Sequence, residues 1–139
     1  MAEGESERLL LATQTLGLSV SPDNIEQLVA YVDLLEKWNR AYNLTAIRDR
    51  REIVDRHLIE SLSIAPFLSG DSRVDVGTGA GLPGIPLAII EPSVHYVLLD
   101  SNGKKTRFLS EVKRALALSN INVETTRVES WRPGRHFDA

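Results

Sequence analysis

The residues with the clearest chemical potential form an acidic, glycine-rich stretch over positions 73–86. It reads Arg-Val-Asp-Val-Gly-Thr-Gly-Ala-Gly-Leu-Pro-Gly-Ile-Pro, so Asp75 precedes three glycines at alternate positions. A short strand that turns through glycines into a helix leaves backbone N–H groups facing outward, with no Cβ atom to keep a ligand away. A plain tight turn needs only one glycine. The stretch therefore predicts a cradle for a nucleotide-type cofactor.

Two classes of cofactor fit this cradle. The glycines within 79–84 match the G-x-G-x-x-G fingerprint of NAD-type dinucleotides, and Asp100 follows at about the spacing which that motif requires. The D-x-G-x-G-x-G pattern of S-adenosylmethionine-binding loops also uses Asp75 and Gly77, which the dinucleotide interpretation leaves without a role. Two prolines at the start of the next segment remove N–H donors that a pyrophosphate would need. The pattern favours S-adenosylmethionine.

Further candidates for the same site follow the next two predicted strands, since parallel strands bind ligands at their carboxyl ends. Asp100 ends the second strand, and one carboxylate can accept hydrogen bonds from both ribose hydroxyls. The alternative for Asp100 is the N-cap of the following helix, for which Ser101 and Asn102 are also available. Glu129 is either an acceptor for an adenine amino group, with the Val128 backbone beside the ring, or an exposed loop acid.

No catalytic residue is predicted. The sequence shows no nucleophile–histidine pair, no acid/base dyad and no metal-ligand spacing, and His57 is interpreted as a hydrogen-bonded structural residue. Methyl transfer to a nucleophile with a free lone pair depends on alignment and desolvation more than on proton transfer.

The elements that must position these residues fall into two parts. Residues 1–70 are predicted to form an all-helical cap, and residues 71–139 the N-terminal half of an α/β domain. Residues 1–7 are expected to be a frayed tail. Helices are predicted over 8–16, 49–65, 85–90 and 106–118, and strands over 73–76, 94–99 and 121–125. A further helix is predicted to begin at Ser21, with an apolar stripe at Ile25, Leu28, Val29, Val32 and Leu35. Alternating strands and helices predict a parallel, Rossmann-like sheet with right-handed crossovers.

Composition narrows the class of protein. Of the 139 residues 42% are apolar, which suffices for a globular core, and the absence of cysteine excludes disulfides and thiol chemistry. No apolar run approaches the length of a membrane span, and residues 1–7 lack the basic and apolar regions of a signal peptide. We therefore expect a cytoplasmic protein. The net charge of −3 argues against a general nucleic-acid coat.

Basic residues nevertheless cluster locally, and two clusters are candidate faces for a phosphate backbone. They comprise Lys37, Arg40, Arg48 and Arg56 in one cluster, and Lys104, Lys105 and Arg107 in the other. On composition alone, a solvated helix surface with i,i+3 and i,i+4 ion pairs is the better interpretation of the first cluster.

Five segments spread along the chain carry a family resemblance. They are 37–45, Arg56–His57 with Ser61, 75–87, 99–109 and 127–129. In these segments the chain resembles the bacterial RsmG (GidB) family, which methylates guanine N7 in small-subunit (16S) ribosomal RNA with S-adenosylmethionine. The alternatives are a catalytically silent RNA- or protein-binding fragment and an NAD-binding domain.

The resemblance implies roles for individual residues. Gly77 and Leu82 would contact S-adenosylmethionine in the loop that also contains Asp75 and Gly79, and Val128 and Glu129 would contact its adenine end. The resemblance also favours RNA contact by both basic clusters. Guanine N7 carries a lone pair and no proton, which agrees with the absence of a predicted base.

Members of this family continue past the position of Asp138, and an arginine soon after it helps to hold the cofactor. A fourth strand would begin after Phe137, so the strand over 73–76 should have a partner on one side only. We therefore expect an unpaired edge at Val74–Val76, marginal stability or self-association, and no methyl transfer by this 139-residue chain.

Overall fold

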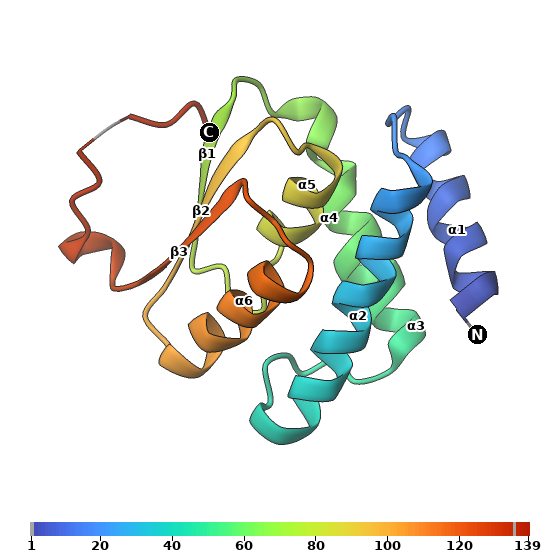
Figure 1. The fold of residues 1–139 in the computed structure, drawn as a ribbon, viewed down its shortest axis with the longest axis horizontal. Helices are drawn as coiled ribbons and strands as arrows, with labels where there is room; N and C mark the ends of the chain where they lie inside the picture. Colours follow the sequence, from blue (N-terminus) through green and yellow to red (C-terminus); the bar gives the residue numbers. More distant parts are fainter. Residues whose placement is uncertain (1, 135) are drawn as a thin grey trace.

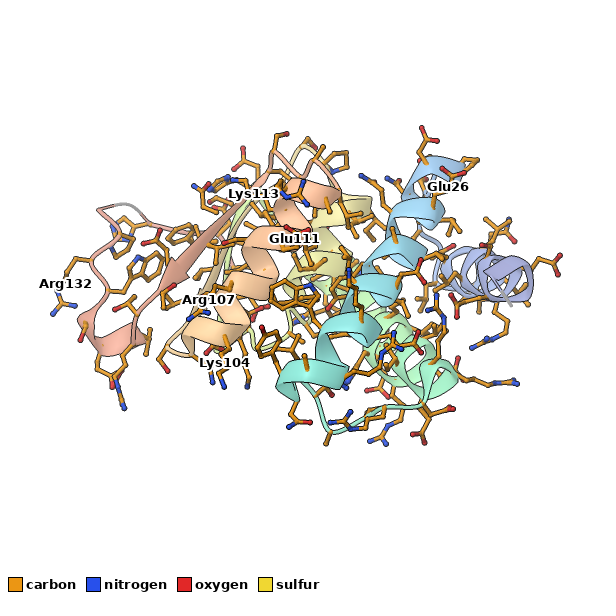
Figure 2. The ribbon with its side chains drawn as sticks, turned by 60° about the horizontal axis from the view of Figure 1, so that its bottom comes forward. Glu26, Lys104, Arg107, Glu111, Lys113 and Arg132 are labelled. Atoms are coloured by element: carbon orange, nitrogen blue, oxygen red, sulfur yellow. The ribbon has the colours of Figure 1, made fainter. Side chains whose placement is uncertain are left out.

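The computed structural model describes residues 2–134 and 136–139 and arranges them in three layers (Figures 1 and 2). The elements are α1 (Ala2–Thr15), α2 (Pro22–Tyr42), α3 (Arg50–Glu52), η1 (Ile53–Ile59), α4 (Glu60–Ser63), η2 (Ala65–Phe67), β1 (Ser72–Val76), α5 (Gly84–Ile90), β2 (His95–Asp100), α6 (Gly103–Ala115), β3 (Ile121–Thr125) and η3 (Val128–Ser130). Helices α5 and α6 cover one face of the sheet, α2 and α4 pack against them, and α1 lies outside α2.

The sheet is parallel, with the strand order β1-β2-β3. Val74 of β1 pairs with Val97 of β2, which pairs with Asn122 of β3. Asp100 pairs with Thr125, so the second and third strands end at the same edge. Each of the first two strands is followed by a helix that returns to this sheet, and the predicted Rossmann-like arrangement is confirmed.

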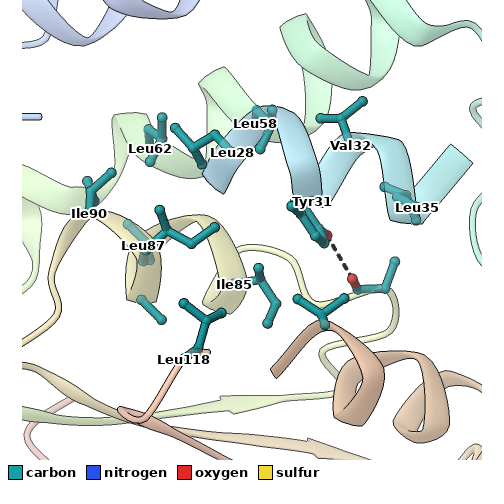
Figure 3. Packing of buried hydrophobic residues seen from close by; sticks show 14 of the residues in the cluster. Leu28, Tyr31, Val32, Leu35, Leu58, Leu62, Ile85, Leu87, Ile90 and Leu118 are labelled. Carbon is teal, nitrogen blue, oxygen red and sulfur yellow. Dashed lines mark hydrogen bonds between the residues drawn. The ribbon is translucent and has the colours of Figure 1, made fainter. Parts of the chain in front are cut away.

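One hydrophobic core joins the N-terminal helices to the α/β part. In Figure 3, side chains of α2 such as Leu28 face Leu62 of α4 and Leu87 of α5. The stripe predicted on α2 is buried except at Val29, which is partly exposed, and Tyr31 belongs to the buried face as well. The division into domains at residue 70 stays a prediction.

Helix α1 begins earlier than expected. Glu5 is buried, and both of its carboxylate oxygens accept hydrogen bonds from Arg50 at 2.8 Å. Arg50 also pairs with Asp33 and Glu36. The predicted frayed tail is therefore wrong for residues 2–7, because a long-range ion pair that local patterns do not reveal anchors the first turn.

The predicted third helix is continuous but changes its winding. Asp49 accepts a hydrogen bond from the Glu52 N–H at 3.2 Å and caps α3, and a π-helical segment, η1, then carries His57. Nε2 of His57 lies at hydrogen-bond distance, 2.9 Å, from the Thr45 hydroxyl, which also accepts the Ile47 N–H. Burial, followed by the charge of Arg56, lowers the pKa of His57. The interpretation of His57 as a hydrogen-bonded residue is confirmed.

The second edge of β1 is partly paired. The Asp138 N–H donates to the Ser72 carbonyl at 2.8 Å, and the Val74 N–H donates to Ala139 O at 2.9 Å. The Asp138 carboxylate also accepts from the N–H groups of Asp71 and Ser72. In Figure 1 the chain swings away after β3 and returns to lie beside β1. The expected unpaired edge is therefore wrong at Val74, because the residues after Phe137 already begin the pairing.

Within the described residues, no helix combines the length and apolar character that crossing a membrane requires.

Candidate functional site

A cavity of about 250 Å³ lies at the carboxyl ends of the three strands. The end of β1, the end of β2 and the segment after β3 each contribute to its wall. The lining residues are Val76, Gly77, Leu99, Asp100, Ser101, Thr126, Arg127, Val128 and Glu129. Gly77, Asp100, Val128 and Glu129 were all predicted for one cofactor site, and the fold brings them together here.

Asp100 connects the end of β2 to the glycine loop (residues 77–83). One carboxylate oxygen accepts the Gly79 N–H at 2.9 Å, and the other accepts the Asn102 N–H at 2.8 Å. The N-cap of α6 is Asn102, whose side chain accepts the N–H groups of Lys104 and Lys105. The capping alternative for Asp100 is therefore wrong. A carboxylate offers about four acceptor positions, so Asp100 retains capacity for further donors on the cavity side.

The sequence predicts that the N–H groups of the glycine loop face outward, and the structure shows that this prediction is wrong. Most are hydrogen-bonded within the protein: Gly77 and Thr78 to the Leu99 carbonyl, Gly79 to Asp100, and Gly81 and Leu82 to the Thr78 carbonyl. The loop folds over the end of β2, where the Leu99 carbonyl and the Asp100 carboxylate accept its N–H groups. Buried N–H groups take such partners because leaving them unpaired is unfavourable. The loop therefore offers a ligand space rather than these donors.

The glycines of the loop divide into two kinds. Gly77 and Gly79 have φ angles of +68° and +59°, and a Cβ atom at either would meet no atom within 4 Å. A Cβ atom at Gly81 would clash with Ile85, and one at Gly84 would clash with Leu98. The first pair leaves open space beside the cavity, whereas the second pair permits close packing of α5.

Asp75 holds the loop closed. Its Oδ2 atom accepts the Thr78 hydroxyl at 2.6 Å and the Gly84 N–H at 3.0 Å. Burial raises the pKa of the Asp75 carboxyl, the two hydrogen bonds oppose this shift, and the charge of Asp100 adds to it. Asp75 does not line the cavity, nor does Leu82, which packs against the core. Gly79 does not line it either, so the structure separates these three predicted residues from Gly77, Asp100, Val128 and Glu129.

Ser101, Thr126 and Arg127 also line the cavity. The corner over 126–130 was predicted to lie at this crevice, but none of these three residues was given a role of its own. Their position directly after strands was the available signal, because loops at the carboxyl ends of parallel strands surround ligand sites. Glu129 has a side chain that is 67% exposed and lies 4.0 Å from Arg127. In the part of the chain that the structure describes, no group of three or more metal-binding side chains is placed to hold an ion.

The C-terminal end of α2 approaches the N-terminal end of α6 beside this edge of the sheet. Lys104 Nζ lies 6.0 Å from the centroid of the Tyr42 ring, which is 44% exposed and packs on Trp38. Figure 2 shows Lys104 and Arg107 together at the N-terminal end of α6. Arg48 is bonded to the backbone of Asn39. The remaining members of both clusters form no ion pair with any described residue: Lys37, Arg40, Arg56, Lys104, Lys105 and Arg107.

An open parallel sheet, a glycine loop after its first strand and a carboxylate at the end of its second define the Rossmann-like class of nucleotide-cofactor-binding proteins. The sequence model of the family described as GidB, rRNA small subunit methyltransferase G, matches residues 24–139. The chain belongs to this family.

Curated relatives agree with this assignment. A protein named ribosomal RNA small subunit methyltransferase G from Ectopseudomonas mendocina is 53% identical over 99% of this chain and 65% of its own length. Proteins of the same name from Saccharophagus degradans and Pseudomonas aeruginosa are 51% and 50% identical, over 96% and 99% of this chain. The chain spans 60% and 65% of the length of these two relatives.

Proposed function

We propose that this chain is the cofactor-binding part of a methyltransferase that transfers a methyl group from S-adenosylmethionine to N7 of a guanine in 16S ribosomal RNA. The family and the names of the relatives support the reaction and the class of RNA. Bacterial ribosomal RNA is cytoplasmic, so the proposal includes that location.

The observation that carries the cofactor assignment is the inward direction of the loop's N–H groups. A pyrophosphate needs free donors, whereas those of Gly77, Gly79 and Gly81 already have protein acceptors. S-adenosylmethionine has no phosphate and needs room beside the loop, which Gly77 and Gly79 leave open. These contacts favour S-adenosylmethionine over NAD.

The proposed roles follow from the position of each residue at the cavity. Asp100 accepts the ribose hydroxyls with the acceptor positions that Gly79 and Asn102 leave free. Val128 and Glu129 bound the adenine end. Asp75 holds the loop in shape, and the direct contact of Leu82 rests on the family resemblance.

S-adenosylmethionine supplies an electrophilic methyl group on a sulfonium centre. Guanine N7 accepts that group with an in-plane lone pair and has no proton to lose, so no general base is required. The chain's own residues contribute by binding, alignment and exclusion of water, and no residue is proposed to transfer a proton.

Titration calorimetry on the 139-residue chain tests the cofactor. S-adenosylhomocysteine, the product form, should bind more tightly than NAD⁺. Tighter binding of NAD⁺ would overturn the assignment.

A transfer assay separates the enzyme from a silent binding module. Small ribosomal subunits and labelled S-adenosylmethionine are incubated with the chain and, in parallel, with the Pseudomonas aeruginosa relative. Label at guanine N7 with the relative supports the proposed reaction. Our expectation that the 139-residue chain transfers none stays a prediction, which stoichiometric transfer by a chain verified by mass would contradict.

We propose that the two basic clusters bind the RNA, and that it is held where the end of α2 approaches the start of α6. Tyr42 offers an exposed aromatic face next to the Lys104 cation, an arrangement that binds unpaired bases by stacking and phosphates by charge. Replacing both Lys104 and Arg107 by alanine should make the dependence of log K on log salt less steep by ~0.7 for each lost phosphate contact with unpaired RNA. Arg114→Ala is the matched control, because Arg114 on the same helix is already paired with Glu111. An unchanged slope in the double variant would exclude this face.

A further inference from the structure

A buried hydrogen bond joins the N-terminal helices to the glycine loop. The hydroxyl of Tyr31, on α2, donates to the carbonyl of Ala80 at 2.7 Å (Figure 3). Ala80 is the residue between Gly79, which is bonded to Asp100, and Gly81, which packs against Ile85. The bond therefore holds the middle of the segment that passes the cavity.

Among the described residues, Ala80 is the one hydrogen-bond partner of the Tyr31 hydroxyl. Its side chain is 0% exposed, and its ring packs in the core with Phe108 at a centroid distance of 6.3 Å. A phenylalanine would satisfy that packing without leaving a buried polar atom of its own. A buried carbonyl without a hydrogen-bond donor is unfavourable, and the Tyr31 hydroxyl provides the donor for the Ala80 carbonyl.

The remaining bonds of the loop come from the α/β part itself. Its N–H groups reach Leu99, Asp100 and Thr78, all of which lie after residue 70. Among the described residues, the Tyr31–Ala80 bond is the one hydrogen bond between residues 2–70 and the loop at 77–83. The helical part therefore acts on the loop through a single directional contact.

We propose that Tyr31 is a positioning residue for the cofactor loop: its hydroxyl fixes the Ala80 peptide, and through it the distance between Gly79 and Asp100. This rests on the proposed cofactor site, since cofactor affinity is one of its consequences. Tyr31 does not line the cavity, so it acts through the loop and not by touching the cofactor.

The protonation state of Tyr31 agrees with a permanent donor role. Burial, and then the negative charge of Asp75, raises the pKa of the Tyr31 hydroxyl far above its ordinary value. The hydroxyl is therefore protonated at neutral pH and can donate to the Ala80 carbonyl.

The test compares two variants of α2 that each remove one hydrogen bond to the α/β part. Tyr31→Phe removes the bond to the loop and keeps the ring. Gln27→Met is the matched control, because Gln27 Nε2 donates to the Leu116 carbonyl at 3.2 Å, away from the loop. Each variant is measured for S-adenosylhomocysteine affinity by calorimetry, for Tm, and for amide hydrogen exchange of residues 79–82.

Tyr31→Phe should raise the dissociation constant of S-adenosylhomocysteine by roughly three- to tenfold, and should speed exchange of the loop amides by a similar factor. Gln27→Met should change neither, at a comparable shift in Tm. Unaltered affinity and unaltered loop exchange in Tyr31→Phe would overturn the inference. Equal losses in both variants would also overturn it, because they would indicate general destabilisation.

The exchange measurement separates this inference from the proposed function. If the parent chain binds no S-adenosylhomocysteine but Tyr31→Phe still accelerates loop exchange alone, the positioning role stands and the cofactor assignment fails. If the parent binds and Tyr31→Phe matches it in both readouts, the cofactor assignment stands and the positioning role fails.

Discussion

The two ends of the sheet use charged side chains in different ways. At the amino end, Arg73 is 4% exposed and donates to Glu91 at 2.7 Å and to the Tyr96 hydroxyl at 2.6 Å. The Tyr96 hydroxyl in turn donates to Glu91 at 2.9 Å. At the carboxyl end, Asp100 accepts two backbone N–H groups, forms no ion pair with a described residue, and lines a cavity.

This difference separates a charge that is paired inside the protein from a charge that can still bind a ligand. The Arg73 guanidinium has a carboxylate and a hydroxyl fixed against it, and its Nε atom is buried without a hydrogen-bond partner among the described residues. The charge of Arg73 is therefore paired inside the protein, and this closed cluster serves the fold. The Asp100 carboxylate is oriented by backbone groups but not neutralised, so it keeps acceptor capacity for a ligand. A group that is oriented and unneutralised beside a cavity is a candidate binding group; a closed cluster is not.

The largest effect should come from breaking the closed cluster. Arg73→Met keeps most of the side-chain volume and leaves Glu91 partly buried without its cation, which should lower the free energy of unfolding by about 3 kcal/mol. Urea denaturation measures this loss. Affinity for S-adenosylhomocysteine, measured in the remaining folded protein, should equal that of the parent.

Arg114→Met is the control for this variant. Arg114 pairs with Glu111 on the exposed surface of α6, where removing a salt bridge should change stability by less than about 1 kcal/mol. Similar losses in the two variants, or weaker cofactor binding in Arg73→Met, would contradict the assignment of the amino end to stability alone.

Asp100→Ala should have the opposite profile. The change leaves ribose hydroxyls and the Gly79 N–H without an acceptor, and should weaken S-adenosylhomocysteine binding by roughly 1–3 kcal/mol with the fold retained. Calorimetry and circular dichroism on the same sample measure both. An unfolded variant, or one that binds as well as the parent, would remove Asp100 from the site.

Asp75 should respond to pH because its pKa is raised in the folded protein, first by burial. A raised pKa means that the favourable contribution is fully present below the unfolded value, about 3.9, and is lost as the pH rises through the higher folded value. The free energy of unfolding of the parent should therefore fall as the pH is raised from the unfolded pKa of Asp75 to its folded pKa. In Asp75→Asn, which retains an acceptor for Thr78 and Gly84, this loss should disappear.

Unfolding of both proteins by urea from pH 4 to pH 7 measures this difference. Asp75→Ala serves as the comparison, since it leaves the Thr78 hydroxyl and Gly84 N–H unpaired and should cost about 1–3 kcal/mol at every pH. Identical pH profiles for the parent and Asp75→Asn would show that Asp75 is not the group responsible.

The smallest effect is expected at Glu129. Its side chain is 67% exposed, so a hydrogen bond to an adenine amino group competes with water. Glu129→Gln should weaken S-adenosylhomocysteine binding about two- to fivefold, and Thr126→Val, on the same wall of the cavity, is a control for shape. A loss as large as that of Asp100→Ala would mean that the wall closes over the ligand.

Much of the framework could be predicted because it depends on local residue types. The apolar strands that end at Asp75 and Asp100, and the glycines between positions 77 and 84, predict a parallel sheet with a loop at its carboxyl edge. The convergence of Gly77, Asp100 and Glu129 follows from that topology alone, since parallel strands end at one edge.

What only the tertiary structure decided is the partner of each polar group. The N–H groups of the loop donate to the Leu99 carbonyl and to Asp100. Arg50 donates to Glu5, and the Ser72 hydroxyl donates to Asp138. The Tyr31 hydroxyl donates to the carbonyl of Ala80, which lies 49 positions further along the chain. Local patterns state which groups need partners, but many acceptors are chemically equivalent along the chain. Packing selects among them, because only the folded core determines which donor and acceptor lie within about 3 Å of each other.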